Sequence, residues 1–425
     1  MGKSVPHSSL SALLILVVTF ASASTANADG FNTFQWTEVN DGSGVMWAPR
    51  AGLQAVSLHG NFYVLGGRAP KIIPETFGDS VFFDDVWRSR NSGKTWHQVT
   101  GGNGAPWAAR AYFQAVTKGR YMYVIGGQDS TVIDNPVYPS CGGVLPPGVP
   151  CPERILASTF FNDVWRSKDG VHWRQMTADA EWTGRAGLSA VTHRGYIYVT
   201  GGSVNDDSAI IGPGGPPRIY FNDVYRSRDG RHWQKMTDAA PWAPRAGAVL
   251  VSKGRYMYLL GGEDGFVCNP QTPRCPPYFN DVWRSVDGKN WTQVTASAGW
   301  SPRPGHQCEV LLGAFVCFGG FGLSEDPTDP FAPANPMDVQ VSWNGVKWFA
   351  LSGDAAPPWN ATGPEDIKYD FAAFPKYWVN GRFRPSIFTF GGDRETFAPF
   401  DPLAFTKVDN DVWRFSPNWR YYWKK

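Results

Sequence analysis

Several features that would indicate other protein classes are missing from this sequence of 425 residues. After the first thirty residues, no stretch approaches the roughly eighteen apolar residues of a membrane span, so we expect a soluble mature protein. No run of five or six basic residues occurs and the formal net charge is only +2, so charge gives no argument for a nucleic-acid partner. The Gly residues have no three-residue period, which excludes collagen.

Motifs for metal and nucleophilic chemistry are also missing. The sequence contains no phosphate-binding glycine loop, no nucleophile elbow and no C-x-x-C pair. Its seven His residues are scattered along the chain. We therefore expect neither a metal site nor a cofactor.

Glycine, proline and aromatic residues are abundant instead. The chain has 47 Gly, 34 Pro and 20 Trp, and 15% of its residues are aromatic. Because Gly and Pro interrupt helices and disordered chains lack aromatic residues, the composition favours a turn-rich, all-β globular fold.

The first 28 residues have the features of a secretory signal peptide. Lys3 gives a positive start, residues 10–20 form an apolar run, and small residues end at Ala28. An apolar run of this length is too short for a stable membrane anchor. We therefore expect a secreted, extracellular protein whose mature chain covers residues 29–425.

Six cysteines are compatible with that oxidising compartment. They lie in three pairs close in sequence, which makes one connectivity the simplest expectation. The predicted disulfides are Cys141–Cys151, Cys268–Cys275 and Cys308–Cys317.

One sequence pattern recurs six times: two apolar runs separated by a turn and ending in Gly-Gly. Each Gly-Gly is followed by a loop and then by D-V-W or a variant of it. The Gly pairs start at residues 66, 126, 201, 261, 319 and 391. An Arg lies sixteen residues before the first five pairs, at Arg50, Arg110, Arg185, Arg245 and Arg303.

Each unit predicts four short strands, which we name a, b, c and d in chain order. Strand b is apolar on both faces, as an inner strand between sheets would be, and D-G or N-G turns favour a hairpin between strands c and d. This pattern resembles the kelch repeat, and more distantly the central domain of galactose oxidase. The resemblance implies a six-bladed β-propeller with four antiparallel strands per blade over residues 29–425.

Closure of the ring has two candidate strands. Residues 34–39 (FQWTEV) match the strand d sequences of other units, so we expect this N-terminal segment to form the outer strand of the last blade. The alternative places residues 419–423 there.

The b–c and d–a loops would share one face of a propeller, and they are the long or variable loops here. This face is therefore the expected binding surface. The five repeated Arg residues have two interpretations: a cationic ring at the channel mouth for carboxylate or sulfate groups, or scaffolding bonds within each blade. Candidate ligand-binding residues are these Arg residues with Trp182, Trp242, His306 and Glu309.

Enzyme chemistry is left open by the sequence. A copper site like that of galactose oxidase needs clustered His and Tyr ligands, and only His306 is expected near the channel. Glu309 is a single acid inside an apolar run, either a functional carboxylate of the channel or a residue that pairs with a neighbouring Arg or faces water.

The sequence thus favours a monomeric, non-catalytic module that binds an extracellular protein or an acidic glycan. The alternatives are a carbohydrate-active enzyme and a structural wall or matrix component. Sequons at Asn290 and Asn360 are candidate glycosylation sites. Sixteen of the 20 Trp residues occupy repeated positions, whereas Trp343, Trp378, Trp419 and Trp423 do not.

Overall fold

The structure is a computed structural model of the whole chain. It describes residues 31, 33–72, 75–76, 78–139, 151–205, 218–265, 277–322, 336, 338–360, 367–394 and 407–418. The predicted signal peptide, the C-terminal segment 419–425 and the predicted pair Cys268–Cys275 lie outside these residues.

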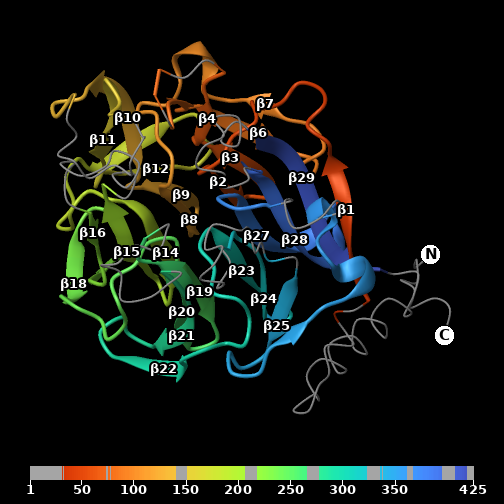
Figure 1. Cartoon of the computed structure of the whole chain (residues 1–425). Coiled ribbons are helices and arrows are strands. Elements are labelled where there is room, and N and C mark those ends of the chain that lie inside the picture. The colour runs from red at the N-terminus through yellow and green to blue at the C-terminus, as the bar shows by residue number, and fades with distance from the viewer. Residues whose placement is uncertain are drawn as a thin grey trace, which may run out of the picture.

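The described chain forms six antiparallel sheets arranged around a central axis, a six-bladed β-propeller (Figure 1). Blade 1 contains β2 (Gln54–Leu58), β3 (Asn61–Leu65), β6 (Val86–Ser89) and β7 (His97–Gln98). Blade 2 contains β8 (Gln114–Lys118), β9 (Tyr121–Ile125), β12 (Val164–Ser167) and β13 (Trp173–Thr177). Blade 3 contains β14 (Ala186–His193), β15 (Tyr196–Val204), β17 (Val224–Ser227) and β18 (Trp233–Thr237), with β16 (Ile219–Tyr220) beside β15.

The other three blades repeat this order. Blade 4 contains β19 (Val249–Lys253), β20 (Tyr256–Glu263), β21 (Tyr278–Ser285) and β22 (Trp291–Thr295). Blade 5 contains β23 (His306–Leu311), β24 (Ala314–Gly319), β25 (Val339–Ser342) and β26 (Phe349–Ala350). Blade 6 contains β27 (Ala372–Val379), β28 (Arg382–Asp393) and β29 (Val408–Pro417), and its outer strand is β1 (Phe34–Asn40).

The pairing of β1 with β29 confirms closure by the N-terminal segment. The register runs from Phe34 opposite Pro417 to Asn40 opposite Val412. Trp36 packs against Phe415 and donates a hydrogen bond from Nε1 to the Ala355 carbonyl at 3.2 Å.

Several short elements lie within the b–c and d–a connections. Two small hairpins pair β4 (Arg68–Pro70) with β5 (Ser80–Phe82) and β10 (Gln128–Asp134) with β11 (Arg154–Phe160). Among the described residues, the 3-10 helices are η2 (Gly101–Asn103), η4 (Gly353–Ala355) and η5 (Pro358–Asn360). No helix within the described ranges has the length and apolar character needed to cross a bilayer.

The hydrophobic core lies between neighbouring blades. Between blades 1 and 2, for example, Val56, Tyr63 and Leu65 pack with Phe113 and Val124. Both faces of strand b are buried in this way, which explains why this strand is apolar throughout.

The repeated Gly-Gly is required where strand b ends against the next blade. Gly127 has a φ of +97°, and an added Cβ would lie 2.6 Å from Phe113 Cβ. Its backbone N–H donates to the Arg185 carbonyl of blade 3 at 2.9 Å. A side chain here would therefore collide with the start of strand a in its own blade, next to the hydrogen bond that joins blade 2 to blade 3.

Candidate binding site at the mouth of the central channel

The six a strands surround a central channel with a cavity of about 430 Å³. At the end next to the b–c and d–a loops, one residue from each blade forms a ring around its mouth. These residues are Gly52, Tyr112, Gly187, Gly247, Gly305 and Asp370. Backbone hydrogen bonds of 2.8–3.1 Å join five of the six consecutive pairs, such as Gly52 N–H to the Asp370 carbonyl and Tyr112 N–H to the Gly52 carbonyl.

The five repeated Arg side chains lie beneath this ring and are buried. Arg185 shows the arrangement: Nη1 and Nη2 contact the two carboxylate oxygens of Asp223 at 2.6 and 3.1 Å. Its Nε and Nη1 also donate to the carbonyls of Thr183 and Gly201, and the guanidinium lies 3.6 Å from the Phe221 ring centroid. The equivalent ion pairs are Arg50–Asp85, Arg110–Asp163, Arg245–Asp281 and Arg303–Asp338.

These contacts correspond to the scaffolding interpretation of the Arg residues rather than to an open cationic ring. Each guanidinium is neutralised by the Asp of the D-V-W motif and bonded to backbone carbonyls of its own blade. A ligand carboxylate or sulfate would have to displace that Asp.

Blade 6 has a basic residue at the same place, which the sequence analysis missed. Lys368 Nζ contacts Asp411 Oδ1 at 2.7 Å and Asp409 Oδ2 at 3.1 Å. Its carbonyl accepts a hydrogen bond from Gly320, as the Arg110 carbonyl does from Gly67. The longer a–b hairpin of blade 6 breaks the sixteen-residue spacing, so only the Asp of D-V-W could have indicated this partner.

Trp182, Trp242 and His306 are packed between blades. Trp182 contacts Trp233 edge-on at 6.1 Å, and Trp242 contacts Trp291 at 4.5 Å. The buried His306 ring lies 5.5 Å from Trp300, and burial together with nearby Arg303 lowers the pKa of its imidazole to about 3. The structure thus places all three in the core of the ring.

Glu309 lines the channel, as its interpretation as a channel carboxylate requires. The same strand position holds Val56, Val116, Val191, Val251 and Phe374 in the other blades. Within the part of the chain that the structure describes, no hydrogen bond or ion pair reaches its carboxylate. Burial raises the pKa of the Glu309 carboxyl to about 8.

A polar cluster at the mouth was not predicted. Arg68 Nε donates to the Tyr112 hydroxyl at 2.6 Å, and Arg68 Nη2 contacts Asp393 Oδ2 at 3.0 Å. Burial raises the pKa of Tyr112 well above its ordinary value, and the nearby carboxylates Asp370 and Asp393 act in the same direction. The cluster thus joins one cation, one phenol and two carboxylates from blades 1, 2 and 6.

The sequence carried a signal for this cluster in the places where the repeats differ. The residue after Gly-Gly changes from blade to blade, and Arg68 and Asp393 occupy it in blades 1 and 6. Two residues after the buried basic residue, four blades have Gly, whereas blades 2 and 6 have Tyr112 and Asp370. Both keep the left-handed backbone of the glycines, with φ of +55° and +50°.

The remaining predicted modification sites are placed only in part. Asn290 lies exposed in the c–d turn of blade 4, where its Nδ2 bonds Asp287 at 3.0 Å. Asn360 ends η5. The Cys308–Cys317 disulfide is confirmed, between opposite residues of β23 and β24. Cys151 is also disulfide-bonded, but Cys141 lies outside the described residues.

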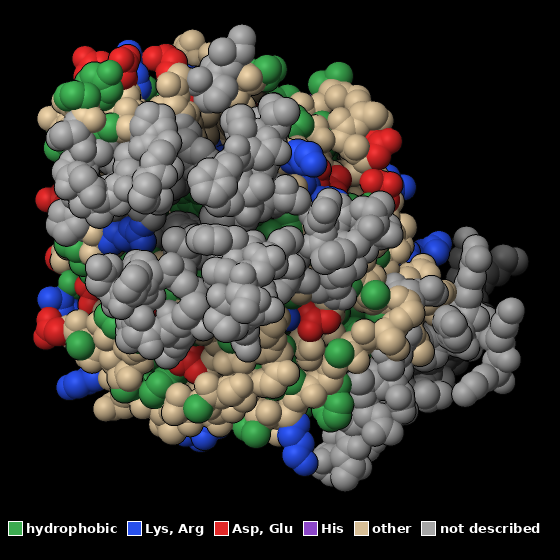
Figure 2. Space-filling view, viewed as in Figure 1, with side chains coloured by type: hydrophobic (Ala, Val, Ile, Leu, Met, Phe, Trp, Pro, Cys, Tyr) green, Lys and Arg blue, Asp and Glu red, His purple; other side chains and the backbone are tan. Residues whose placement is uncertain are grey.

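No group of three or more His, Cys, Asp or Glu side chains suited to a metal ion occurs within the described ranges. The face seen in Figure 2 carries described Asp and Glu side chains close to Lys and Arg side chains, so it is not of a single charge sign.

Comparison with known proteins supports the fold alone. No family model matches the sequence, and no curated protein matches it. Among solved structures, the one described as "Structure of YjhT" superposes with a TM-score of 0.55. It is 16% identical in sequence, and the match covers 86% of this chain and 94% of that chain. At this identity the likeness shows a shared propeller architecture and nothing of the ligand.

Proposed function

We propose that this protein is a secreted, non-catalytic glycan-binding propeller, and that the mouth of its channel holds a neutral sugar. The observation that carries the proposal is the pair Tyr112 and Asp370. Both hold a left-handed backbone that costs a residue with a side chain about 1 kcal/mol or more, where the other blades use Gly. Such positions commonly mark binding sites, and both side chains belong to the mouth cluster.

The chemistry of the cluster suits hydroxyl groups. Carboxylates such as Asp370 accept two hydroxyl donors, whereas the Arg68 guanidinium donates and the Tyr112 hydroxyl can do either. A few polar groups of this kind around a concave site are typical of small-ligand recognition. An acidic sugar is disfavoured here, because two carboxylates face the single cation and the repeated Arg residues are neutralised within their blades.

A carbohydrate-active enzyme is the second candidate, because a phenol and two carboxylates gather at one mouth. The electrostatics favour binding over catalysis. The raised pKa of Tyr112 keeps its phenol protonated at neutral pH, so it is not poised as a nucleophile or base. Asp393 Oδ2 is engaged in an ion pair with Arg68 at 3.0 Å, so this oxygen is already occupied within the protein.

Binding can be tested with the mature chain and a panel of neutral and acidic mono- and oligosaccharides, using ligand-observed NMR. We expect a neutral sugar to bind, and Tyr112→Phe or Asp370→Asn to weaken binding about tenfold through loss of a hydrogen bond. The matched control is Tyr196→Phe. Its hydroxyl also accepts an Arg hydrogen bond, from Arg228 Nε at 2.8 Å, but on the opposite face.

Two results would overturn the proposal. One is a sugar whose affinity is unchanged by both mouth variants while their melting temperatures match the wild type. The other is product formation in the same NMR samples that is lost in the Asp370→Asn variant, which would establish the enzyme instead.

A further inference from the structure

The face opposite the mouth is rich in basic residues, although the net charge of the whole chain is only +2. This turn face consists of the a–b and c–d turns with the ends of their flanking strands. These segments carry 21 Lys and Arg residues but only three Asp and no Glu, whereas the whole chain has 39 basic and 37 acidic residues. One further carboxylate reaches them from outside, because Glu181 accepts a hydrogen bond from Trp233 N–H. The ranges counted are 57–62, 88–97, 117–122, 166–174, 192–197, 226–234, 252–257, 284–292, 310–315, 341–349, 376–386 and 414–418.

The basic side chains of the turn face have no acidic partners. None of these 21 Lys and Arg residues forms an ion pair with a described carboxylate. Several guanidiniums lie on Tyr rings instead, such as Arg166 on Tyr121 at 4.3 Å and Arg226 on Tyr196 at 4.4 Å. The three Asp side chains bond backbone N–H groups and a side chain of their own turns, His172, His232 and Asn290 respectively, and none pairs with Lys or Arg. The face therefore presents net positive charge to solvent.

Blade 6 adds a projecting structure to this face. Its a–b hairpin continues past the point where the other blades turn, and residues 377–379 and 382–385 form the extension. The extension is fastened on both sides: the Tyr377 hydroxyl accepts a hydrogen bond from Leu312 N–H at 3.1 Å. On the other side, Ser92 Oγ bonds Asn380 Oδ1 at 3.1 Å.

The extension exposes an aromatic ring. Trp378 is 59% exposed, the largest exposure among the described aromatic side chains, and its ring is supported edge-on by Phe383 at 5.6 Å. Trp378 occupies none of the repeated Trp positions, so blade packing does not account for it. A fixed, exposed indole provides a flat surface on which a sugar ring can stack.

Two guanidiniums meet at the base of the same hairpin. Arg384 lies close enough to Arg414 to disfavour its charge, and the Nε atoms of both are buried without a hydrogen-bond partner. Ser416 Oγ, two residues along the strand from Arg414, is also buried without a partner. Neighbouring half-buried cations without a counter-ion are unfavourable, and an anion that joins them would offset their repulsion.

We infer that the turn face binds an acidic polysaccharide, with a carboxylate or sulfate held by Arg384 and Arg414 and a sugar ring stacked on Trp378. The wider basic surface supplies attraction along the chain of such a ligand. The Cys308–Cys317 disulfide fits an oxidising, extracellular setting, where acidic polysaccharides are available and nucleic acids are not the expected partner. This site is separate from the channel mouth, so either proposal can fail without the other.

The test measures binding of the mature chain to immobilised polygalacturonate and dextran sulfate, with neutral dextran as the reference. We expect both acidic polymers to bind, more weakly as salt increases, and neutral dextran not to bind. Trp378→Ala and the double variant Arg384→Gln/Arg414→Gln should each weaken binding about tenfold or more. The exposed Arg382→Gln should weaken it less, and it has no buried contacts whose loss could unfold the blade.

The matched controls lie on the opposite face. Arg154→Gln and Tyr138→Ala remove an exposed cation and an exposed ring near the b–c loops and should leave polymer binding unchanged. The proposal fails if neither acidic polymer binds, or if the control variants reduce binding as much as Trp378→Ala. If single-stranded DNA or anionic lipid vesicles bind more tightly than either polymer, the partner of this face is not a polysaccharide.

Discussion

Single residues that depart from the repeat are the most informative positions in this propeller. Glu309 stands in the channel where four other blades have Val. By contrast, an Arg equivalent to Arg185 occurs in five blades and pairs with the D-V-W Asp in each, through both carboxylate oxygens in four of them, as scaffolding requires. A residue that recurs in every blade therefore indicates a structural role, whereas a residue that departs from the repeat indicates a role specific to this protein.

The Glu309 carboxyl in the channel predicts a specific pH dependence of stability. In the unfolded chain this carboxyl loses its proton near its ordinary pKa, whereas in the folded protein the pKa of Glu309 is about 8. The folded state thus retains the proton longer, so stability falls as pH rises from about 4.5 to about 8. Glu309→Gln should match the wild type at pH 4 and be more stable by roughly 2–5 kcal/mol at pH 8–9.

Denaturant unfolding of both proteins across that pH range measures the effect. Glu309→Asp provides the control that keeps the ionisable group and should keep the pH dependence. A stability difference between wild type and Glu309→Gln that is constant with pH would show that the channel carboxyl titrates in the folded protein as it does in the unfolded chain, which contradicts the raised pKa.

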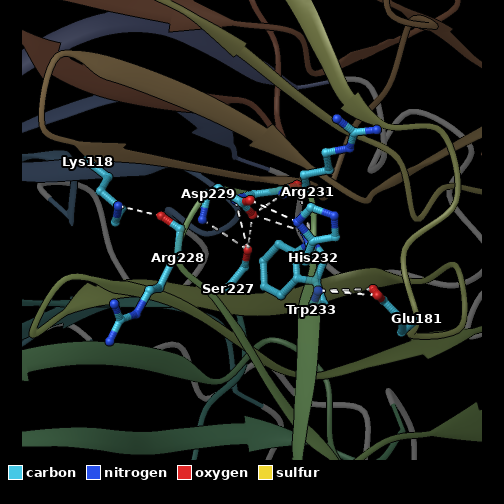
Figure 3. A network of polar contacts seen from close by, with 9 residues as sticks. Lys118, Glu181, Ser227, Arg228, Asp229, Arg231, His232 and Trp233 are labelled. Atoms are coloured by element: carbon cyan, nitrogen blue, oxygen red, sulfur yellow. Dashed lines mark hydrogen bonds and ion pairs between the residues drawn. The ribbon is translucent and has the colours of Figure 1, made fainter.

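At the scale of elements, the c–d turn is closed by side-chain hydrogen bonds that recur between blades, and Figure 3 shows those of blade 3. Asp229 Oδ1 accepts hydrogen bonds from the N–H groups of Arg231 and His232 at 2.8 and 3.0 Å. Ser227 Oγ accepts from Gly230 N–H at 2.8 Å, and the Trp233 indole donates to the Gly230 carbonyl. The turn is thereby closed by side chains, and strand d starts at a set register.

Replacing Asp229 should therefore loosen one turn without opening the ring. Asp229→Ala removes two acceptor bonds and should cost about 1–2 kcal/mol, with faster hydrogen exchange of the Arg231 and His232 amides. Asp229→Asn should behave almost as wild type, because blade 5 uses Asn344 Oδ1 for the same bonds. Unchanged exchange in the Ala variant would mean that Ser227 and Trp233 hold the turn by themselves.

The a–b hairpins show how an element can be altered while the blade is kept. In blade 6 the hairpin is lengthened, and Lys368 replaces Arg below it without loss of the ion pair to the D-V-W Asp. In blade 5, Gln340 replaces the D-V-W Trp and still donates to Asp338, at 2.6 Å. Degenerate sequence therefore does not mean a degenerate blade.

At the scale of the whole molecule, the ring depends on a strand from its far end. β1 covers β29 and brings Phe34 and Trp36 into the core beside Phe318 and Phe415. A chain that begins at residue 42 should melt at a lower temperature and self-associate, because the uncovered edge of β29 can pair with another chain. Thermal unfolding and light scattering report these two effects.

Adding the missing strand as a separate peptide of residues 29–41 should restore the melting temperature. The same peptide with Trp36→Ala should restore it less, since Trp36 is nearly buried against β29 and Ala355. If the truncated chain stays monomeric and melts at the same temperature as the full chain, the pairing of β1 with β29 contributes no stability.

Much of this propeller follows from the sequence because its information is local and repeated. The number of blades, the strand order, the N-terminal closure and the Cys308–Cys317 disulfide all depend on short spacings that recur or match each other. Turn residues and strand alternation act over a few residues, so they can be interpreted without knowing which blades touch.

Only the tertiary structure decided which side chains contact one another. Arg185 and Asp223 are 38 residues apart, and nothing in either local segment says that they pair. Arg68 and Asp393, which are 325 residues apart, meet only because the ring closes. The sequence by itself determined the propeller, with nearly equal numbers of acids and bases. Folding decided that 21 of those bases share one face with three acids, because every turn of the repeat returns to the same side of the ring.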